Sequence, residues 1–321
     1  MVYWYRKKEK NRRRAPGKEH RMGYTERMLN AKDGAGLTLR VYEAEKAKAA
    51  VMCIHGMEEH QGRYRPFAEY LQGAGYTVVT ADLRGHGPKA AAVSHIADQD
   101  GDKLLLEDEE TKLDMIRKAW PGLPVILFAH SMGTIIARVL LKVHSRDFAS
   151  VVLSGYPNPN AAAGIGAALA GFLRAFKGGK GHSGLIDSMV LGPFSKAVPN
   201  RKSDLDWLSA NPENVKQYMA DPLCGVPFTL GSYHAMFRLI QQMADGKGYE
   251  NVKKDLPILL ISGSADPCTG GEKGRANSES VLRSAGFGNL STIVPDGMRH
   301  EILNENGREE VYRQILAFIT R

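Results

Sequence analysis

Short runs of apolar residues, many of them β-branched, recur along the chain and predict buried strands. Six such runs lack polar alternation, as expected when helices cover both faces of a sheet: Ala50–Ile54, Thr77–Ala81, Val125–Ala129, Ser150–Leu153, Ile258–Ser262 and Ser291–Val294. Between them, apolar residues recur every three or four positions, which predicts helices over Tyr64–Leu71, Leu106–Trp120, Thr134–His144, Asn277–Ala285 and Glu309–Ile319. This alternation of strands and helices predicts an α/β fold around a mostly parallel sheet.

The alternation stops over residues 156–250, where only helical patterns occur. They cover Ala161–Phe176, Asn214–Met219 and Tyr233–Met243. We therefore predict an α/β core of residues 22–155 and 251–321, with residues 156–250 inserted between two late strands as a helical cap. Ala161–Phe176 is too short to span a bilayer. It is either an ordinary helix of the insertion or a helix that flanks an apolar substrate entrance.

The strand Val125–Ala129 runs into His130-Ser131-Met132-Gly133, and a helical pattern follows directly. A serine between small residues at a strand-to-helix turn is typical of a nucleophile elbow, here with Ala129 in the first glycine position. The tight turn holds the serine in a strained conformation, so small neighbours avoid clashes. The alternative is that Ser131 is only the N-cap of the helix.

A nucleophilic serine needs a base, and the base needs a group that orients it. In elbow-containing folds the chain order is serine, acid, histidine. Asp266 lies in a turn after the apolar run Ile258–Ser262, and His300 lies in the loop before the last helix. Each residue follows a predicted strand, at the edge where open α/β sheets place their sites. We expect Ser131, Asp266 and His300 to form a triad, with Asp296 as the reserve candidate for the acid.

The third requirement is a pair of N–H donors for the oxyanion of the tetrahedral intermediate. One donor is expected from Met132, directly after the nucleophile. The other is expected from the loop after Ala50–Ile54, where His55-Gly56-Met57 places a flexible glycine beside the backbone N–H of Met57.

Three segments together resemble the monoacylglycerol lipase and lysophospholipase group of α/β-hydrolases. They are His55-Gly56-Met57-Glu58-Glu59-His60-Gln61-Gly62-Arg63-Tyr64, Asp82-Leu83-Arg84-Gly85-His86-Gly87 and the elbow around Ser131. Asp221-Pro222-Leu223-Cys224-Gly225 is similar to a segment of bacterial members. The resemblance implies an α/β-hydrolase fold with a helical cap and a serine ester hydrolase. It also implies that Glu59 and Arg63 lie near the polar head of the substrate; the alternative is an ion pair that holds their loop.

The sequence departs from the family pattern at two places. Ala129 replaces the first glycine of the elbow, and Pro88-Lys89 follow the Gly85-His86-Gly87 turn where a serine is common. We expect neither departure to abolish activity. The spacing of His55, Glu58, Glu59 and His60 fits neither HExxH nor HxxEH, so we expect no metal there.

The net charge of +8 over 321 residues is concentrated at the N-terminus. Residues 1–21 hold nine basic and two acidic side chains, so they carry +7 and the other 300 residues carry +1. We interpret this segment as a basic arm that is solvated, or that contacts anionic lipid through its charges and Tyr3-Trp4-Tyr5. A near-neutral body argues against nucleic-acid binding. The three cysteines are widely spaced and form no disulfide framework.

The sequence therefore predicts hydrolysis of a carboxylic ester through an acyl-serine, without a cofactor, on a monoacylglycerol-like or lysophospholipid-like substrate. The alternatives are a short-acyl carboxylesterase, a serine peptidase of the same fold, and a non-catalytic binding protein, which would be expected to have lost part of the triad. We expect a cytoplasmic location, with peripheral membrane contact through the arm. The pattern makes no prediction about the oligomeric state.

Overall fold

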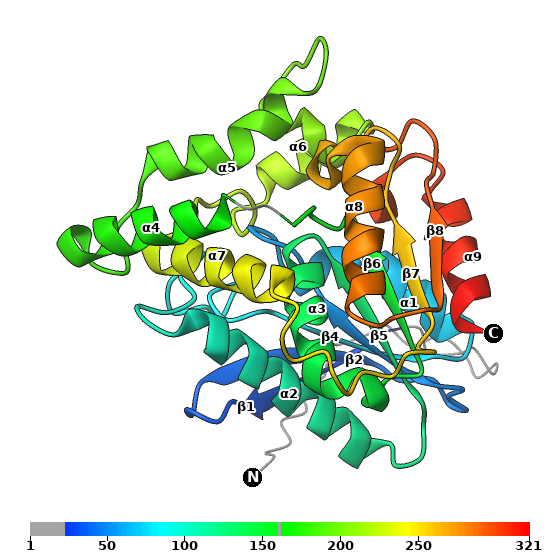
Figure 1. Cartoon of the computed structure of the whole chain (residues 1–321). Coiled ribbons are helices and arrows are strands. Elements are labelled where there is room, and N and C mark those ends of the chain that lie inside the picture. The colour runs from blue at the N-terminus through cyan, green and yellow to red at the C-terminus, as the bar shows by residue number, and fades with distance from the viewer. Residues whose placement is uncertain (1–22, 160–161) are drawn as a thin grey trace, which may run out of the picture.

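The computed structural model describes residues 23–159 and 162–321, so the basic arm predicted over residues 1–21 lies outside the described residues (Figure 1). Eight strands form one sheet in the order β1-β2-β4-β3-β5-β6-β7-β8. β2 pairs antiparallel with β1 and β4, and the strands from β4 to β8 pair in parallel. The bounds are β1 Thr25–Asn30, β2 Gly36–Tyr42, β3 Ala50–Ile54, β4 Thr77–Ala81, β5 Val125–His130, β6 Ser150–Ser154, β7 Ile258–Ile261 and β8 Leu290–Ile293. The predicted mostly parallel α/β sheet is confirmed.

Helices cover both faces of this sheet (Figure 1). Leu127 and Ala129 of β5 pack with α2, α3 and α8 on one face, and Ile126 and Phe128 pack with α1 and α9 on the other. This two-residue alternation explains the unbroken apolar strands, since successive side chains enter opposite cores. The helices are α1 Arg65–Gly73, α2 Gly101–Ala119, α3 Met132–His144, α8 Gly271–Ser284 and α9 Arg308–Ile319.

The segment between β6 and β7 is helical and lies over one edge of the sheet (Figure 1). The Tyr218 hydroxyl and the Gly225 N–H both donate to the carbonyl of Glu58, in the loop after β3, at 2.8 and 2.9 Å. This contact places the segment over the carboxyl ends of the parallel strands. Its helices are α4 Ala163–Lys177, α5 Gly184–Lys196, α6 Pro212–Ala220 and α7 Leu230–Ala244.

Small residues fix the packing of α4 against α7. A Cβ on Gly166 would lie 2.8 Å from the ring of Phe237, so only glycine allows this approach. The opposite side of α4 exposes Ile165, Phe172 and Phe176. Within the described residues, no helix combines the length and apolar character needed to cross a membrane.

The structure adds elements that the hydrophobic pattern did not predict. At the antiparallel end of the sheet, β1 is mostly exposed, and β2 alternates apolar and polar side chains over residues 37–41. Helix α5 contains Pro193, and glycine stands at positions 184 and 192, which obscures its periodicity.

Candidate active site

Ser131 lies at the sharp turn between β5 and α3. Its φ of 51° and ψ of −123° are strained for a residue with a side chain. A Cβ on Gly133 would lie 2.5 Å from the carbonyl oxygen of Ile54, so glycine lets α3 pass close to β3. Ala129 is fully buried at the other side of the turn. The sequence therefore forms a tight elbow here, with an alanine where a glycine is usual.

Ser131, His300 and Asp266 form a continuous hydrogen-bonded chain. The Ser131 Oγ lies 2.8 Å from His300 Nε2, and His300 Nδ1 lies 3.0 Å from Asp266 Oδ2. Asp266 Oδ1 also accepts the N–H of Cys268 at 2.9 Å, which fixes the carboxylate. Asp296, the reserve acid, instead accepts a hydrogen bond from the exposed Ser264 hydroxyl. The structure thus brings together the three residues selected from the sequence, separated by 135 and 34 positions.

The environment of His300 favours its protonated form. Burial alone would lower the pKa of His300, but the Asp266 carboxylate raises it, and the pKa ends above its ordinary value. Neighbouring His130 lies with its ring centroid 4.8 Å away, and burial lowers the pKa of His130 to about 4. His130 is therefore neutral at pH 7, while His300 is set up to accept a proton.

The loop after β3 lies directly against the nucleophile. A Cβ on Gly56 would lie 3.0 Å from Ser131 Cβ, so the backbone of Gly56-Met57 borders the serine. Met132 is the first residue of α3, so its N–H has no acceptor within the helix. These are the positions of the two N–H donors expected for an oxyanion, Met57 and Met132.

Glu59 and Arg63 use their hydrogen-bonding groups within the protein. Glu59 accepts from the Gly56 N–H and the Tyr64 hydroxyl, both at 2.7 Å, and from Arg63 at 3.2 Å. Arg63 also forms a two-pronged ion pair with Glu301, next to the base. Burial would raise the pKa of Glu301, but Arg63 lowers it to about 2. The geometry favours a role in which Glu59 and Arg63 hold two loops together: residues 55–60 after β3, named here the oxyanion loop, and residues 298–301, which carry His300. Direct contact with substrate stays a prediction.

Glu58, next to Met57, was not singled out as a site residue from the sequence. Its φ is 55°, its side chain is buried, and its Oε1 accepts the Phe228 N–H at 3.3 Å. Burial raises the pKa of Glu58 to about 8, and Asp187 of α5 acts in the same direction. No sequence pattern indicates this contact, because Glu58 and Phe228 are 170 residues apart.

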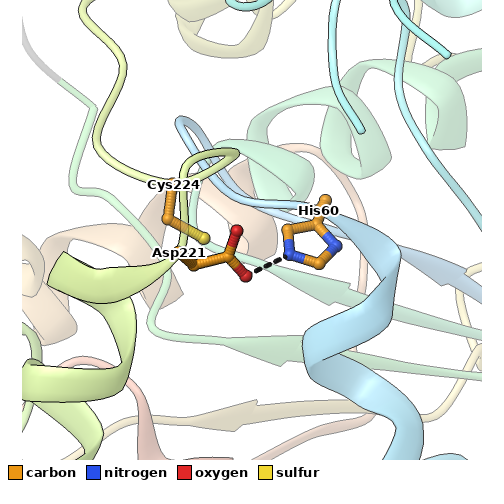
Figure 2. A group of neighbouring side chains, drawn as sticks. All are labelled: His60, Asp221 and Cys224. Atoms are coloured by element: carbon orange, nitrogen blue, oxygen red, sulfur yellow. Dashed lines mark hydrogen bonds and ion pairs between the residues drawn. The ribbon is translucent and has the colours of Figure 1, made fainter. Parts of the chain in front are cut away.

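His60, Asp221 and Cys224 gather where the oxyanion loop meets the segment after α6 (Figure 2). The Gly62 N–H donates to His60 Nδ1, so Nε2 carries the proton and donates to Asp221 at 2.8 Å. A metal on Nε2 would move that proton to Nδ1, facing the Gly62 N–H. Burial raises the pKa of the Cys224 thiol to about 12. The group is therefore accounted for as a hydrogen-bonded contact between core and cap, not as a metal site.

The glycine turn that was part of the family resemblance has a structural role. Asp82 accepts hydrogen bonds from the Gln61 backbone and side chain, and a Cβ on Gly87 would lie 2.2 Å from its carboxylate. Arg84 pairs with Asp33 and Asp108. The motif therefore ties the loop after β4 to the loop after β3 and touches none of the triad residues through these bonds.

Comparison with known proteins agrees with this geometry. The profile of the family described as "Serine aminopeptidase, S33" matches residues 45–307, most of the chain and all of the site. The chain belongs to this family. It is an α/β-hydrolase and an enzyme of the hydrolase class, as predicted.

Similar proteins of known name and structure include lipases and esterases. The chain is 27% identical to a monoacylglycerol lipase of Mycolicibacterium smegmatis over 276 residues, 85% of this chain and 88% of the relative. It is 29% identical to the human monoglyceride lipase over 248 residues, 74% and 72% of the two chains. The crystal structure of a thermostable carboxyl esterase from Bacillus coagulans, in complex with glycerol, superposes with a TM-score of 0.84 at 25% identity, covering 93% and 98% of the chains.

Proposed function

We propose that this protein hydrolyses carboxylic esters through an acyl-enzyme on Ser131. The observation that carries the proposal is the 2.8 Å contact between the Ser131 Oγ, on its strained elbow, and His300 Nε2. Membership of a serine hydrolase family and the lipase and esterase names among the relatives support it.

The first half of the reaction acylates the serine. His300 Nε2 takes the proton of Ser131 as Oγ attacks the ester carbonyl, and the N–H groups of Met57 and Met132 bind the oxyanion. Asp266 keeps the Nδ1 proton of His300 in place and stabilises the imidazolium. When the tetrahedral intermediate collapses, His300 gives its proton to the leaving alcohol. The acyl group then remains on Ser131.

In the second half, water replaces the alcohol. His300 takes a proton from the water, which attacks the acyl-serine carbonyl, and the same two N–H groups bind the second oxyanion. Collapse returns the proton to Ser131 and releases the carboxylic acid. No step needs a cofactor.

For the substrate, we propose an ester with a medium or long acyl chain on a small polar head, of the monoacylglycerol or lysophospholipid kind. Two lines of support are the names of the relatives and the apolar side chains that α4 and α5 expose, which are Ile165, Phe172, Phe176, Leu185 and Met189. Such side chains suit the approach of an acyl chain to the cap.

A second candidate is an aminopeptidase, because two acids, Glu58 and Asp187, lie near the loop that carries Met57. Asp187 Oδ1 is buried, and the Asp187 charge acts on Glu58 beside Met57. The family's own description also names an aminopeptidase. A positively charged amino terminus would pair with Asp187 and would favour ionisation of Glu58, whose pKa of about 8 otherwise keeps it mostly neutral at pH 7.

One panel separates these candidates. We expect turnover of p-nitrophenyl esters to rise from acetate to chains of eight or more carbons, with 1-monoacylglycerol cleaved and amino-acid p-nitroanilides inert. A maximum on acetate would favour a short-acyl esterase and contradict the lipid proposal. Fast anilide turnover with slow ester turnover would favour the peptidase. The Ser131→Ala variant is the matched blank for every substrate.

We further propose that the protein is cytoplasmic and touches membranes peripherally through residues 1–21. The support is their charge of +7 with Tyr3-Trp4-Tyr5, a composition that suits anionic headgroups. Deleting residues 1–21 should reduce co-sedimentation with phosphatidylserine vesicles and leave hydrolysis of a soluble ester unchanged. Equal sedimentation of both proteins would remove the lipid role of the arm.

A further inference from the structure

A buried arginine on the nucleophile helix has no acidic partner. Arg138 is 1% exposed and lies two turns after Ser131 on α3. Its Nε donates to the Thr134 carbonyl at 3.1 Å, and its Nη2 donates to the Pro157 carbonyl at 2.7 Å and to Thr134 Oγ1 at 3.3 Å. Its Nη1 has no partner among the described residues. Neutral oxygens alone therefore face this side chain.

Arg138 is nevertheless charged at neutral pH. Burial lowers the pKa of Arg138 to about 10, and no carboxylate contributes to its surroundings in residues 23–159 and 162–321. A buried charge without a counter-charge is unfavourable by several kcal/mol (on the order of 3–5 kcal/mol when a partner is removed), so proteins rarely leave one unmatched. The positive charge of Arg138 and the two N–H bonds of its Nη1 would be stabilised by a negatively charged acceptor, and the described residues provide none.

Two further buried hydroxyls lie just after β6 and β7. The hydroxyls of Tyr156 and Ser262 are fully buried and lie within reach of each other, and neither bonds any other group of the described chain. Tyr156 directly precedes Pro157, which accepts from Arg138, and Ser262 follows Ile261, whose carbonyl accepts the Gly155 N–H at 2.9 Å. The ends of β6 and β7 thus bring both hydroxyls toward the arginine.

Helix α8 closes the same region from the other side. Asn277 donates to Asn158 at 2.8 Å, and a Cβ on Gly274 would lie 3.3 Å from the Asn158 amide, so residues 156–158 bridge α3 and α8. Arg275 follows Gly274, and its Nη1 is buried without a partner in the described residues. Burial raises the pKa of Tyr156, while a contact with the Ser262 hydroxyl and the charges of Arg275 and Arg138 act in the opposite direction.

We propose that Arg138, Tyr156, Ser262 and Arg275 bind a small inorganic anion of the halide class, such as chloride, between α3 and α8. The two hydroxyls can share one hydrogen bond, and the groups then left over, one hydroxyl and the Nη1 atoms of both arginines, are all donors. The two arginines are also positively charged. The burial of Arg138, Tyr156 and Ser262 suits a monatomic ion better than a polyatomic one. The site adjoins the triad, since the charge of Asp266 also acts on Tyr156. The anion would fix the nucleophile helix against the helix that follows the catalytic acid.

Anomalous scattering tests the site without reference to activity. Crystals soaked in bromide should give an anomalous peak within hydrogen-bond distance of Arg138 Nη1 and the Tyr156 hydroxyl. The peak should be absent from Tyr156→Phe crystals soaked in the same way. Ordered water at that position, with no anomalous signal in the wild type, would overturn the proposal.

Thermal unfolding gives a second readout in solution. At equal ionic strength, replacing sodium gluconate by sodium chloride should raise the wild-type Tm by about 2 °C or more, because a ligand that binds only the folded state stabilises it. The rise should vanish in Arg138→Met and in Tyr156→Phe, which keeps the arginine if the first variant folds poorly. It should persist in Arg117→Met, whose arginine pairs with Asp147 at the surface. Equal shifts in all four proteins would contradict a specific site.

Discussion

The indole of Trp207 packs against the imidazole of His300, with 4.9 Å between the ring centroids and 43° between the ring planes. Trp207 belongs to the short 3-10 turn Asp206–Leu208 of the cap. The contact is held on both sides. Arg299 donates to the Asp206 and Ser209 carbonyls at 2.6 and 3.1 Å, and the Glu301 N–H donates to Leu208 at 2.8 Å. An aromatic ring of the cap therefore packs directly against His300.

This contact should help His300 to carry a positive charge. A cation beside an aromatic ring is stabilised by about 0.5–2 kcal/mol, and about 1.4 kcal/mol corresponds to one pH unit. Trp207→Leu should therefore lower the pKa of His300 and shift the acidic limb of the pH profile of kcat/KM to lower pH, by about 0.4 to 1.5 pH units. Trp207→Phe should shift it less. Trp120→Leu serves as the control, because Trp120 is the C-cap of α2 and its ring packs under Arg27. An unmoved limb in Trp207→Leu would show that the indole only fills space.

The acid of the triad gives a second, larger effect. Asp266→Asn should lower kcat by about 10⁴-fold, because the amide favours the wrong tautomer of His300. Asp266 also raises the pKa of His300, so the residual activity should appear at lower pH than in the wild type. Asp296→Asn is the matched control and should retain wild-type kcat. The reverse pattern, with loss only in Asp296→Asn, would reassign the acid.

The ion pair beneath the site should matter for stability. Glu301→Gln removes the two-pronged partner of buried Arg63 and should lower the free energy of unfolding by about 3 kcal/mol at pH 7. The pKa of Glu301 is about 2 in the folded protein and 4.5 in its ordinary state. The stabilisation is therefore complete above about pH 4.5 and is lost as the pH falls toward 2. Urea unfolding at pH 7 and pH 3 measures both differences. The exposed pair of Glu309 makes Glu309→Gln the comparison, with a change of at most about 0.5 kcal/mol.

Glu58 should act in the opposite direction. Its pKa is raised to about 8, so the fold favours the neutral carboxyl and loses stability as pH rises from about 4.5 to 8. Glu58→Gln keeps the acceptor for the Phe228 N–H without the titration. It should therefore be more stable than the wild type at pH 8 and similar at pH 4.5, by urea unfolding. Greater stability of the wild type at pH 8 would mean that the carboxylate is paired.

Much of this architecture is predictable from sequence, and the reason is physical. Parallel strands buried on both faces are continuously apolar, so β3 to β7 stand out, and their carboxyl ends meet at one edge. That geometry is why Ser131, Asp266 and His300 can be selected from positions far apart. The pattern does not predict β1 because four of its six residues are exposed, nor β2 because polar Thr38 and Arg40 interrupt its apolar residues.

Contacts between the cap and the core were not predictable in the same way. Trp207 contacts His300, and Phe228 contacts Glu58. A hydrophobic pattern predicts that a helix forms but not how that helix is oriented against the sheet, so it does not predict these contacts. Glu59 and Arg63 were found through the family resemblance, but the sequence left their role open between substrate contact and an ion pair. Only the distances to Gly56, Tyr64 and Glu301 favour the second.

The central claim is that Ser131 is an activated nucleophile, and covalent labelling tests it most directly. A fluorophosphonate should react with one serine per wild-type chain, and mass spectrometry should place the adduct on Ser131. Ser131→Ala should neither label nor hydrolyse esters, and labelling of the wild type should slow below the pKa of His300. An adduct on another residue, or ester hydrolysis that survives in Ser131→Ala, would contradict the account.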